Sequence, residues 1–125
     1  MTAYLNGEYM PVEDCRIPAN DRGFILGDAV YEVIAVYNNA PFEVEKHLAR
    51  LEHSLRSSGI PNPHSRAEWH AVFQRLTQNE AADDFGIYLQ VSRGVAARDV
   101  TAPPGLKPLT FANHAPHQAG PAARD

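Results

Sequence analysis

The sequence predicts an α+β fold in which two helices pack on one side of a mainly antiparallel sheet. Short runs of alternating apolar and polar residues near both ends of the chain predict strands, and two stretches in the middle repeat apolar residues at helical spacing. Because the predicted strands and helices come in separate groups rather than in strict alternation, the pattern favours α+β over α/β. The 125 residues suffice for one compact domain and not for two ordinary ones.

The chain opens with a predicted β-hairpin. Asn6-Gly7 separates the alternating segments 3–5 and 8–10. Asn-Gly is the preferred pair for a type I′ turn because both central residues need a positive φ. Residues 11–28 are rich in proline, glycine, asparagine and aspartate, and they predict an irregular loop.

A long strand is predicted from Ala29 to Tyr37, since this run is rich in β-branched and aromatic residues. Both of its faces are largely apolar, which predicts a central strand that is covered on both sides. Asn38-Asn39 fits a turn, and the segment 41–43 fits a short return strand.

Two amphipathic helices follow. The first has an apolar stripe and stops at Gly59, and the second starts at Ser65 with Glu68 three residues later, the pattern of a capping box. The buried stripes are predicted to consist of Val44, Leu48, Leu51 and Leu55 in the first helix and of Trp69, Val72, Phe73 and Leu76 in the second.

Two more strands are predicted near the end of the chain, around residues 87–91 and around Leu109 and Phe111. From about residue 115 the sequence turns to proline, alanine, glycine and histidine without periodicity. We therefore expect one folded domain over residues 1–114 and an interdomain linker or frayed end over residues 115–125.

Composition excludes several function classes. A net charge of -4 and a pI near 5.8 give no electrostatic footprint for nucleic acid. No apolar run approaches the roughly 20 residues of a membrane span, and the N-terminus does not have the pattern of a secretory signal. With Cys15 as the single cysteine, we expect a cytoplasmic protein without an internal disulfide. The six histidines show no metal-ligand spacing, so no metal is expected.

Glu32 stands out because it lies on an otherwise aliphatic strand face, with Val30 and Ile34 as neighbours. A buried carboxylate needs a partner or it is driven toward its neutral form. We expect a structural ion pair with an arginine such as Arg22 rather than a catalytic role.

Two segments resemble a known protein family. Residues 21–33 are a glycine-punctuated loop that leads into a strand, and His47-Leu48-Ala49-Arg50-Leu51 matches the family pattern His-x-x-Arg-Leu. Together they resemble the N-terminal domain of the fold-type IV pyridoxal-phosphate enzymes, the class IV aminotransferases, and the D-amino-acid transaminases in particular. The resemblance implies the small α+β domain of that fold and pyridoxal 5'-phosphate as the cofactor.

Arg50 is the residue that the resemblance assigns to the cofactor. An arginine on an amphipathic helix is ordinarily a solvated surface residue. The resemblance implies instead that Arg50 holds the phosphate of pyridoxal phosphate, and a planar guanidinium suits this role because it donates two parallel hydrogen bonds.

Three further residues are implied to contact the substrate. By alternation alone, Tyr31 and Val33 are β formers on one strand face, whereas the resemblance places both at the active-site cleft. Arg98 follows the segment 88–94 as in D-amino-acid transaminases, where this arginine binds the substrate α-carboxylate. The chain departs from that family at Val100, which stands where the archetype has a histidine. The substrate class is therefore less closely defined than the cofactor.

The chain contains only two lysines, Lys46 and Lys107. Pyridoxal-phosphate chemistry requires an amine that holds the cofactor, and in the family this lysine lies on a strand of a second, larger domain. Neither Lys46, on the exposed face of a helix, nor Lys107, in a loop, resembles it. We therefore expect that domain to be absent from this chain and the 125 residues alone to be inactive.

The resemblance implies amino group transfer between a D-amino acid and a 2-oxo acid in the intact enzyme, with an active site completed across a homodimer. Branched-chain aminotransferase, (R)-amine transaminase and aminodeoxychorismate lyase remain open as related activities. The alternative from another class is a truncated, non-catalytic module that folds and dimerises without turnover.

Overall fold

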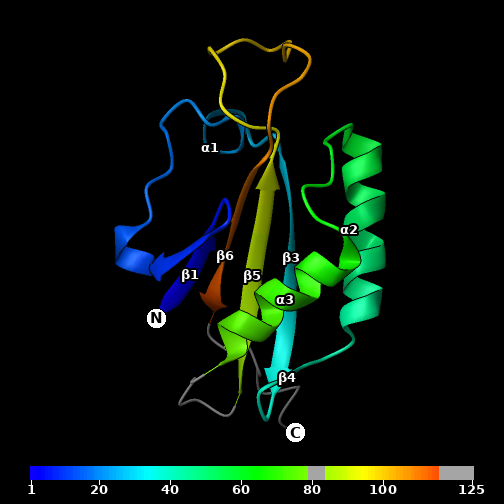
Figure 1. Cartoon of the computed structure of the whole chain (residues 1–125). Helices are drawn as coiled ribbons and strands as arrows, with labels where there is room; N and C mark the ends of the chain where they lie inside the picture. The colour runs from blue at the N-terminus through cyan, green and yellow to red at the C-terminus, as the bar shows by residue number, and fades with distance from the viewer. Residues whose placement is uncertain (79–83, 116–125) are drawn as a thin grey trace, which may run out of the picture.

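The computed structural model describes residues 1–78 and 84–115. Over these ranges the chain forms a six-stranded sheet with the strand order β2-β1-β6-β5-β3-β4, and its two long helices pack against the sheet (Figure 1). All neighbouring strands are antiparallel. The predicted α+β class is therefore confirmed.

The elements follow one another in the order that the sequence predicts, with two short helical segments added. They are β1 (Thr2–Leu5), β2 (Glu8–Pro11), the 3-10 turn η1 (Val12–Asp14), α1 (Arg22–Leu26), β3 (Ala29–Tyr37), β4 (Ala40–Pro41), α2 (Val44–Ser58), α3 (Arg66–Thr77), β5 (Asp84–Ser92) and β6 (Leu109–Ala115).

The N-terminal hairpin forms at the predicted turn. Asn6 and Gly7 have φ values of 49° and 96°, the positive angles that a type I′ turn requires. The prediction of a wholly irregular loop over residues 11–28 is wrong, because it contains the one-turn helix α1. Asp21 begins α1 by accepting a hydrogen bond from the N–H of Phe24, and the left-handed Gly27 ends it.

The short return strand β4 pairs only with the end of β3. Its two residues lie opposite Val36 and Tyr37, and Phe42 adds one backbone bond to the carbonyl of Ala35. The return strand predicted over residues 41–43 lies instead at Ala40–Pro41, because Glu43, with a φ of 56°, already caps the start of α2. The first half of β3 therefore has an open edge within the described part of the chain.

The two long helices begin and end where the sequence indicates. Gly59, with a φ of 69°, ends α2, and its N–H bonds the carbonyls of Arg56 and Leu55. Ser65 and Glu68 form the predicted capping box at the start of α3, each side chain accepting from the other's backbone N–H. Among the described residues, no helix combines the length and the apolar character that crossing a bilayer demands.

The helices cover only one face of the sheet. The even positions Ile34 and Val36 of β3 are fully buried, and they pack with the apolar stripes of α2 and α3 and with alternate residues of β5. On the other face, Tyr31 and Val33 are 64% and 46% exposed. The prediction that β3 is covered on both sides is therefore wrong for the described residues, because apolar side chains on the odd positions have no layer above them.

Trp69 is the largest fully buried side chain of the core. Its ring stacks on Phe73 and meets His64 edge to face, and its indole N–H donates to the Asn62 side chain at 3.1 Å.

Trp69→Ala should lower the free energy of unfolding by about 3–5 kcal/mol, because it leaves a cavity and leaves the side-chain amide of Asn62 without its indole partner. Urea unfolding followed by circular dichroism measures the change. The exposed Gln74→Ala on the same helix should stay within about 0.5 kcal/mol, and an equal loss in both variants would contradict the assignment of Trp69 to the core.

Candidate active site

The uncovered face of the sheet carries Tyr31 and Val33, the two residues that the family resemblance places at an active-site cleft. Tyr31 and Val33 of β3 lie opposite Gln90 and Tyr88 of β5, so the four side chains share this face. The rings of Tyr31 and Tyr88 stack with centroids 5.8 Å apart, and the Tyr88 hydroxyl donates to Gln90 at 2.8 Å.

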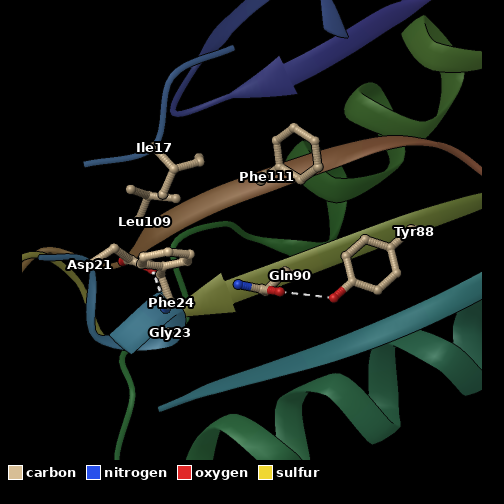
Figure 2. Close-up of a pocket in the computed structure, with 8 residues that line it drawn as sticks. All are labelled: Ile17, Asp21, Gly23, Phe24, Tyr88, Gln90, Leu109 and Phe111. Atoms are coloured by element: carbon tan, nitrogen blue, oxygen red, sulfur yellow. Dashed lines mark hydrogen bonds between the residues drawn. The ribbon is translucent and has the colours of Figure 1, made fainter. Parts of the chain in front are cut away.

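A pocket of about 400 Å³ opens on the same face, where α1 meets the ends of β5 and β6 (Figure 2). Its lining is mostly apolar, with the amide of Gln90 and the hydroxyl of Tyr88 as polar groups in its wall. The lining residues are Ile17, Asp21, Gly23, Phe24, Tyr88, Gln90, Leu109 and Phe111.

Glu32 points to the opposite, helix-covered face, where its side chain is only 4% exposed. The Nε of Arg50 donates to Glu32 Oε2 at 2.8 Å, and Nη2 donates to Oε1 at 2.7 Å. His47 Nδ1 lies 2.7 Å from Oε1. The predicted partner Arg22 is therefore wrong: the structural ion pair forms, but with Arg50 and His47 of α2.

The protonation of this cluster follows from its geometry. Burial by itself would raise the pKa of Glu32, but the hydrogen bonds and charges of Arg50 and His47 outweigh burial and hold that pKa below its ordinary value. An ionised carboxylate only accepts, so His47 carries a proton on Nδ1 and directs it at Glu32. The same carboxylate raises the pKa of Arg50, which stays charged.

Arg50 keeps donors free for a further anion. A guanidinium has five N–H bonds, of which Glu32 takes one from Nε and one from Nη2. The Arg50 side chain is 65% exposed. It borders a hollow of about 430 Å³ at the open edge of β3, whose other lining residues are Tyr31, Glu32, Val33 and Ser54. The structure thus brings Arg50, Tyr31 and Val33 together.

Ser54 is the residue of this hollow that the sequence reasoning missed. It lies four residues after Arg50, so both side chains project from the same side of α2. Within the described ranges no hydrogen bond engages its hydroxyl. The i, i+4 spacing from Arg50 was the signal that could have identified it.

Arg98 lies elsewhere, in the exposed loop between β5 and β6 that rises beyond the end of the sheet in Figure 1. It lines neither the hollow at Arg50 nor the pocket at Phe24. The base of the loop is fixed at Gly94, whose φ is 123° and where any Cβ would strike the carbonyl oxygen of Lys107. The fold of this chain therefore does not bring Arg98 to Tyr31.

No cluster of three or more potential metal ligands occurs among residues 1–78 and 84–115. Lys46 pairs with Glu43 at 3.1 Å on the surface of α2, with 79% of its side chain exposed. Lys107 is exposed in the loop before β6. Neither lysine lines the hollow at Arg50.

Comparison with known proteins defines the family. The model of the family "Amino-transferase class IV" matches residues 29–124, so the chain belongs to the class IV aminotransferases. A D-alanine aminotransferase from Bacillus licheniformis is 38% identical over 118 residues, which are 94% of this chain and 42% of that protein. One from Staphylococcus aureus strain N315 is 34% identical over 110 residues, 87% of this chain and 39% of that protein. The chain thus spans about two fifths of the length of these curated relatives.

Solved structures show the same fold. Escherichia coli branched-chain amino acid aminotransferase superposes with a TM-score of 0.86 at 21% identity, over 98% of this chain and 42% of that chain. A hypothetical aminotransferase from Mycobacterium tuberculosis, in its PLP-bound form, gives a TM-score of 0.80 at 26% identity, over 95% of this chain and 40% of that chain. 4-Amino-4-deoxychorismate lyase from Pseudomonas aeruginosa gives a TM-score of 0.78 at 28% identity, over 96% of this chain and 42% of that chain.

The pKa of Glu32 predicts how stability changes with pH. Because the folded-state pKa lies below the ordinary value of about 4.5, the ion pair stabilises the fold fully above that value and is lost as the pH falls through the folded-state pKa. Glu32→Gln should therefore flatten the dependence of the unfolding free energy on pH below about 4.5. Urea titrations between about pH 3 and 7 measure this slope. Glu13→Gln, at an exposed position, should keep the parental slope, and an unchanged slope in Glu32→Gln would contradict the pairing.

Proposed function

We propose that this chain is the part of a pyridoxal-phosphate-dependent aminotransferase that holds the cofactor phosphate and one side of the substrate. The observation that carries the proposal is the guanidinium of Arg50, which Glu32 orients through two hydrogen bonds and which lines the hollow beside Tyr31 and Val33. In the complete enzyme, the amino group would pass from a D-amino acid to a 2-oxo acid.

The donor set fits a phosphate. Arg50 is permanently charged, and its free donors form a planar fork that matches two phosphate oxygens. The pairing with Glu32 fixes the plane of that fork without consuming it. Ser54, one turn further along α2, offers a hydroxyl to the same anion. When bound, the cofactor would supply an electron sink for the bond that breaks at the amino acid.

The residues of the open face would shape the substrate side. Val33 provides an apolar wall, and Tyr31 combines an apolar ring with a hydroxyl that can donate to a carboxylate. Arg98 would hold the α-carboxylate through two parallel hydrogen bonds. Since Arg98 and Tyr31 lie apart within one chain, Arg98 would reach the cleft of the neighbouring subunit in a homodimer and form the carboxylate site there with Tyr31. Because Val100 replaces the histidine of the family archetype, this site would have no third donor.

The amine that holds the cofactor would come from outside these 125 residues, since Lys46 and Lys107 both lie away from the hollow. In that case the segment acts only as part of a larger enzyme. The second candidate is a module that folds and associates without turnover, and the positions of the two lysines favour it for the 125 residues by themselves. Reading the coding sequence beyond Asp125 distinguishes the two candidates.

Arg50 and Arg98 should have separable effects in the full-length enzyme. Arg50→Ala should weaken pyridoxal-phosphate binding about tenfold to a hundredfold, because a charge-assisted hydrogen bond contributes roughly 1.5–3 kcal/mol. Arg98→Ala should raise KM for the D-amino acid and leave the cofactor bound. Cofactor absorbance and steady-state kinetics measure the two effects.

Arg56 provides the matched control because it is an exposed arginine on the same helix, away from the hollow. Arg56→Ala should leave both cofactor affinity and KM within about twofold of the parent. Equal loss of cofactor in the Arg50 and Arg98 variants would contradict the proposed division between phosphate and carboxylate.

We further propose that the protein forms a homodimer. The open face exposes large apolar side chains, among them Phe24 at 74% and Tyr31 at 64%. Large apolar side chains exposed in this way favour contact with a partner, and isologous pairing is the commonest arrangement of identical chains. Sedimentation velocity over a concentration series should show a discrete dimer. A single monomeric species at high concentration would contradict the proposal, and a polydisperse distribution would indicate only nonspecific association.

A further inference from the structure

Arg22 is a buried arginine that joins two segments far apart in the sequence. Its side chain is only 5% exposed. Nε donates to Asp28 Oδ2 at 2.8 Å, Nη1 donates to the backbone carbonyl of Asp99 at 2.6 Å, and Nη2 reaches the carbonyl of Val100 at 3.4 Å. One guanidinium therefore connects the start of β3 with the two residues that follow Arg98.

Asp28 anchors this guanidinium to the rest of the fold. Its carboxylate also accepts from Arg93, with Nε at 2.6 Å and Nη2 at 3.1 Å. Arg93 in turn donates to the carbonyls of Ser58 and Gly59 at the end of α2. The hydrogen bonds from Arg93 and Arg22 outweigh burial and hold the pKa of Asp28 below its ordinary value, so the anchor remains charged.

The carbonyls that Arg22 holds belong to an exposed loop. The residues around them are exposed, and Val100 reaches 88%. Water could satisfy carbonyls in such a loop, so stability alone gives little reason to bury a guanidinium beneath them. The hydrogen bonds of Arg22 instead hold the backbone next to Arg98 in a fixed position relative to Asp28, at the start of β3. The backbone N–H of Arg22 adds to this by donating to the carbonyl of Gly94 at 2.8 Å.

We propose that Arg22 is a positioning residue that sets where Arg98 lies and thereby determines the affinity for the substrate carboxylate. The inference rests on the proposed role of Arg98. Arg22 does not contact the substrate. It acts through the backbone, because its Nη1 and Nη2 bind the carbonyls of Asp99 and Val100. Asp28 holds the guanidinium itself in place through Nε. A lysine could not replace it, because a single ammonium on a flexible stem cannot bind a carboxylate and two carbonyls in one fixed plane.

Arg22→Lys in the full-length enzyme tests the proposal. We expect KM for a D-amino acid to rise about tenfold, with the pyridoxal-phosphate affinity within twofold and the melting temperature within a few degrees of the parent. In an Arg98→Ala background, the same substitution should change KM less than twofold, because the position of the loop no longer matters. Hydrogen exchange at residues 97–101 should become faster in Arg22→Lys.

Arg16→Lys is the matched control. Arg16 also donates to loop carbonyls, those of Glu13 at 2.7 Å and Cys15 at 3.0 Å, but it lies in an exposed segment away from Arg98. We expect no change in KM from Arg16→Lys. A rise in KM equal to that of Arg22→Lys would overturn the positioning role.

A second variant keeps the proposal testable if Arg22→Lys does not fold. Asp28→Asn keeps the size of the side chain and removes the charge that anchors Nε of Arg22. We expect KM to rise several-fold with the cofactor affinity within twofold of the parent. An unchanged KM in Asp28→Asn would overturn the proposal.

The outcomes separate this inference from the proposed function. If Arg98→Ala raises KM while a folded Arg22→Lys does not, the positioning role alone is overturned. If the two substitutions multiply independently in the double variant, it is overturned as well. If Arg98→Ala leaves KM unchanged, the carboxylate role of Arg98 falls, and the role of Arg22 falls with it.

Discussion

The buried carboxylate of Glu32 is the constraint on which the candidate site depends. It lies on the covered face of β3, where an unpaired charge would cost several kcal/mol, and two side chains of α2 supply its partners. Since both oxygens of Glu32 are bonded to Arg50, the guanidinium is held in one plane at the open edge of the strand. A surface arginine thereby becomes an oriented one, which is what recognition of a planar pair of anion oxygens requires.

The two faces of β3 perform different tasks. Alternation places Glu32, Ile34 and Val36 toward the helices, where burial stabilises the domain. The same alternation leaves Tyr31 and Val33 on the open face. The hollow at Arg50 lies at the edge between the two faces because β4 pairs only with the end of β3. A longer β4 would cover that edge, so the shortness of this strand is part of the site.

Much of the fold is predictable from local signals. Apolar spacing and the caps at Gly59 and Ser65 predict α2 and α3, because periodicity and backbone geometry act within a few residues. The one-turn helix α1 was missed because five residues are too few to show a period. Which side of β3 is covered depends on packing between distant elements, and the alternation of its residues does not carry that information.

The candidate site was predictable from the sequence only in part. The alternation indicated correctly that Tyr31 and Val33 share a face, and burial of charge indicated correctly that Glu32 needs an arginine. The choice of Arg22 over Arg50 failed because both arginines are within reach along the chain and only the path of α2 decides between them. Arg22 instead pairs with Asp28, six residues away, and reaches Asp99 through the fold. The functional roles of Arg50, Tyr31, Val33 and Arg98 stay predictions.

Two acidic residues, Asp28 just before β3 and Glu32 within it, explain why α2 is held in one position. Asp28 and Glu32 are four residues apart, and each binds two basic side chains. Glu32 engages the first half of α2 through Arg50, whereas Asp28 engages its last carbonyls through Arg93. Because hydrogen bonds are directional, two separate attachments prevent the helix from sliding or rotating on the sheet. Apolar packing is not directional and resists such movement less well. The position of Arg50 beside Tyr31 and that of the loop that carries Arg98 therefore both depend on two charges, one just before β3 and one within it.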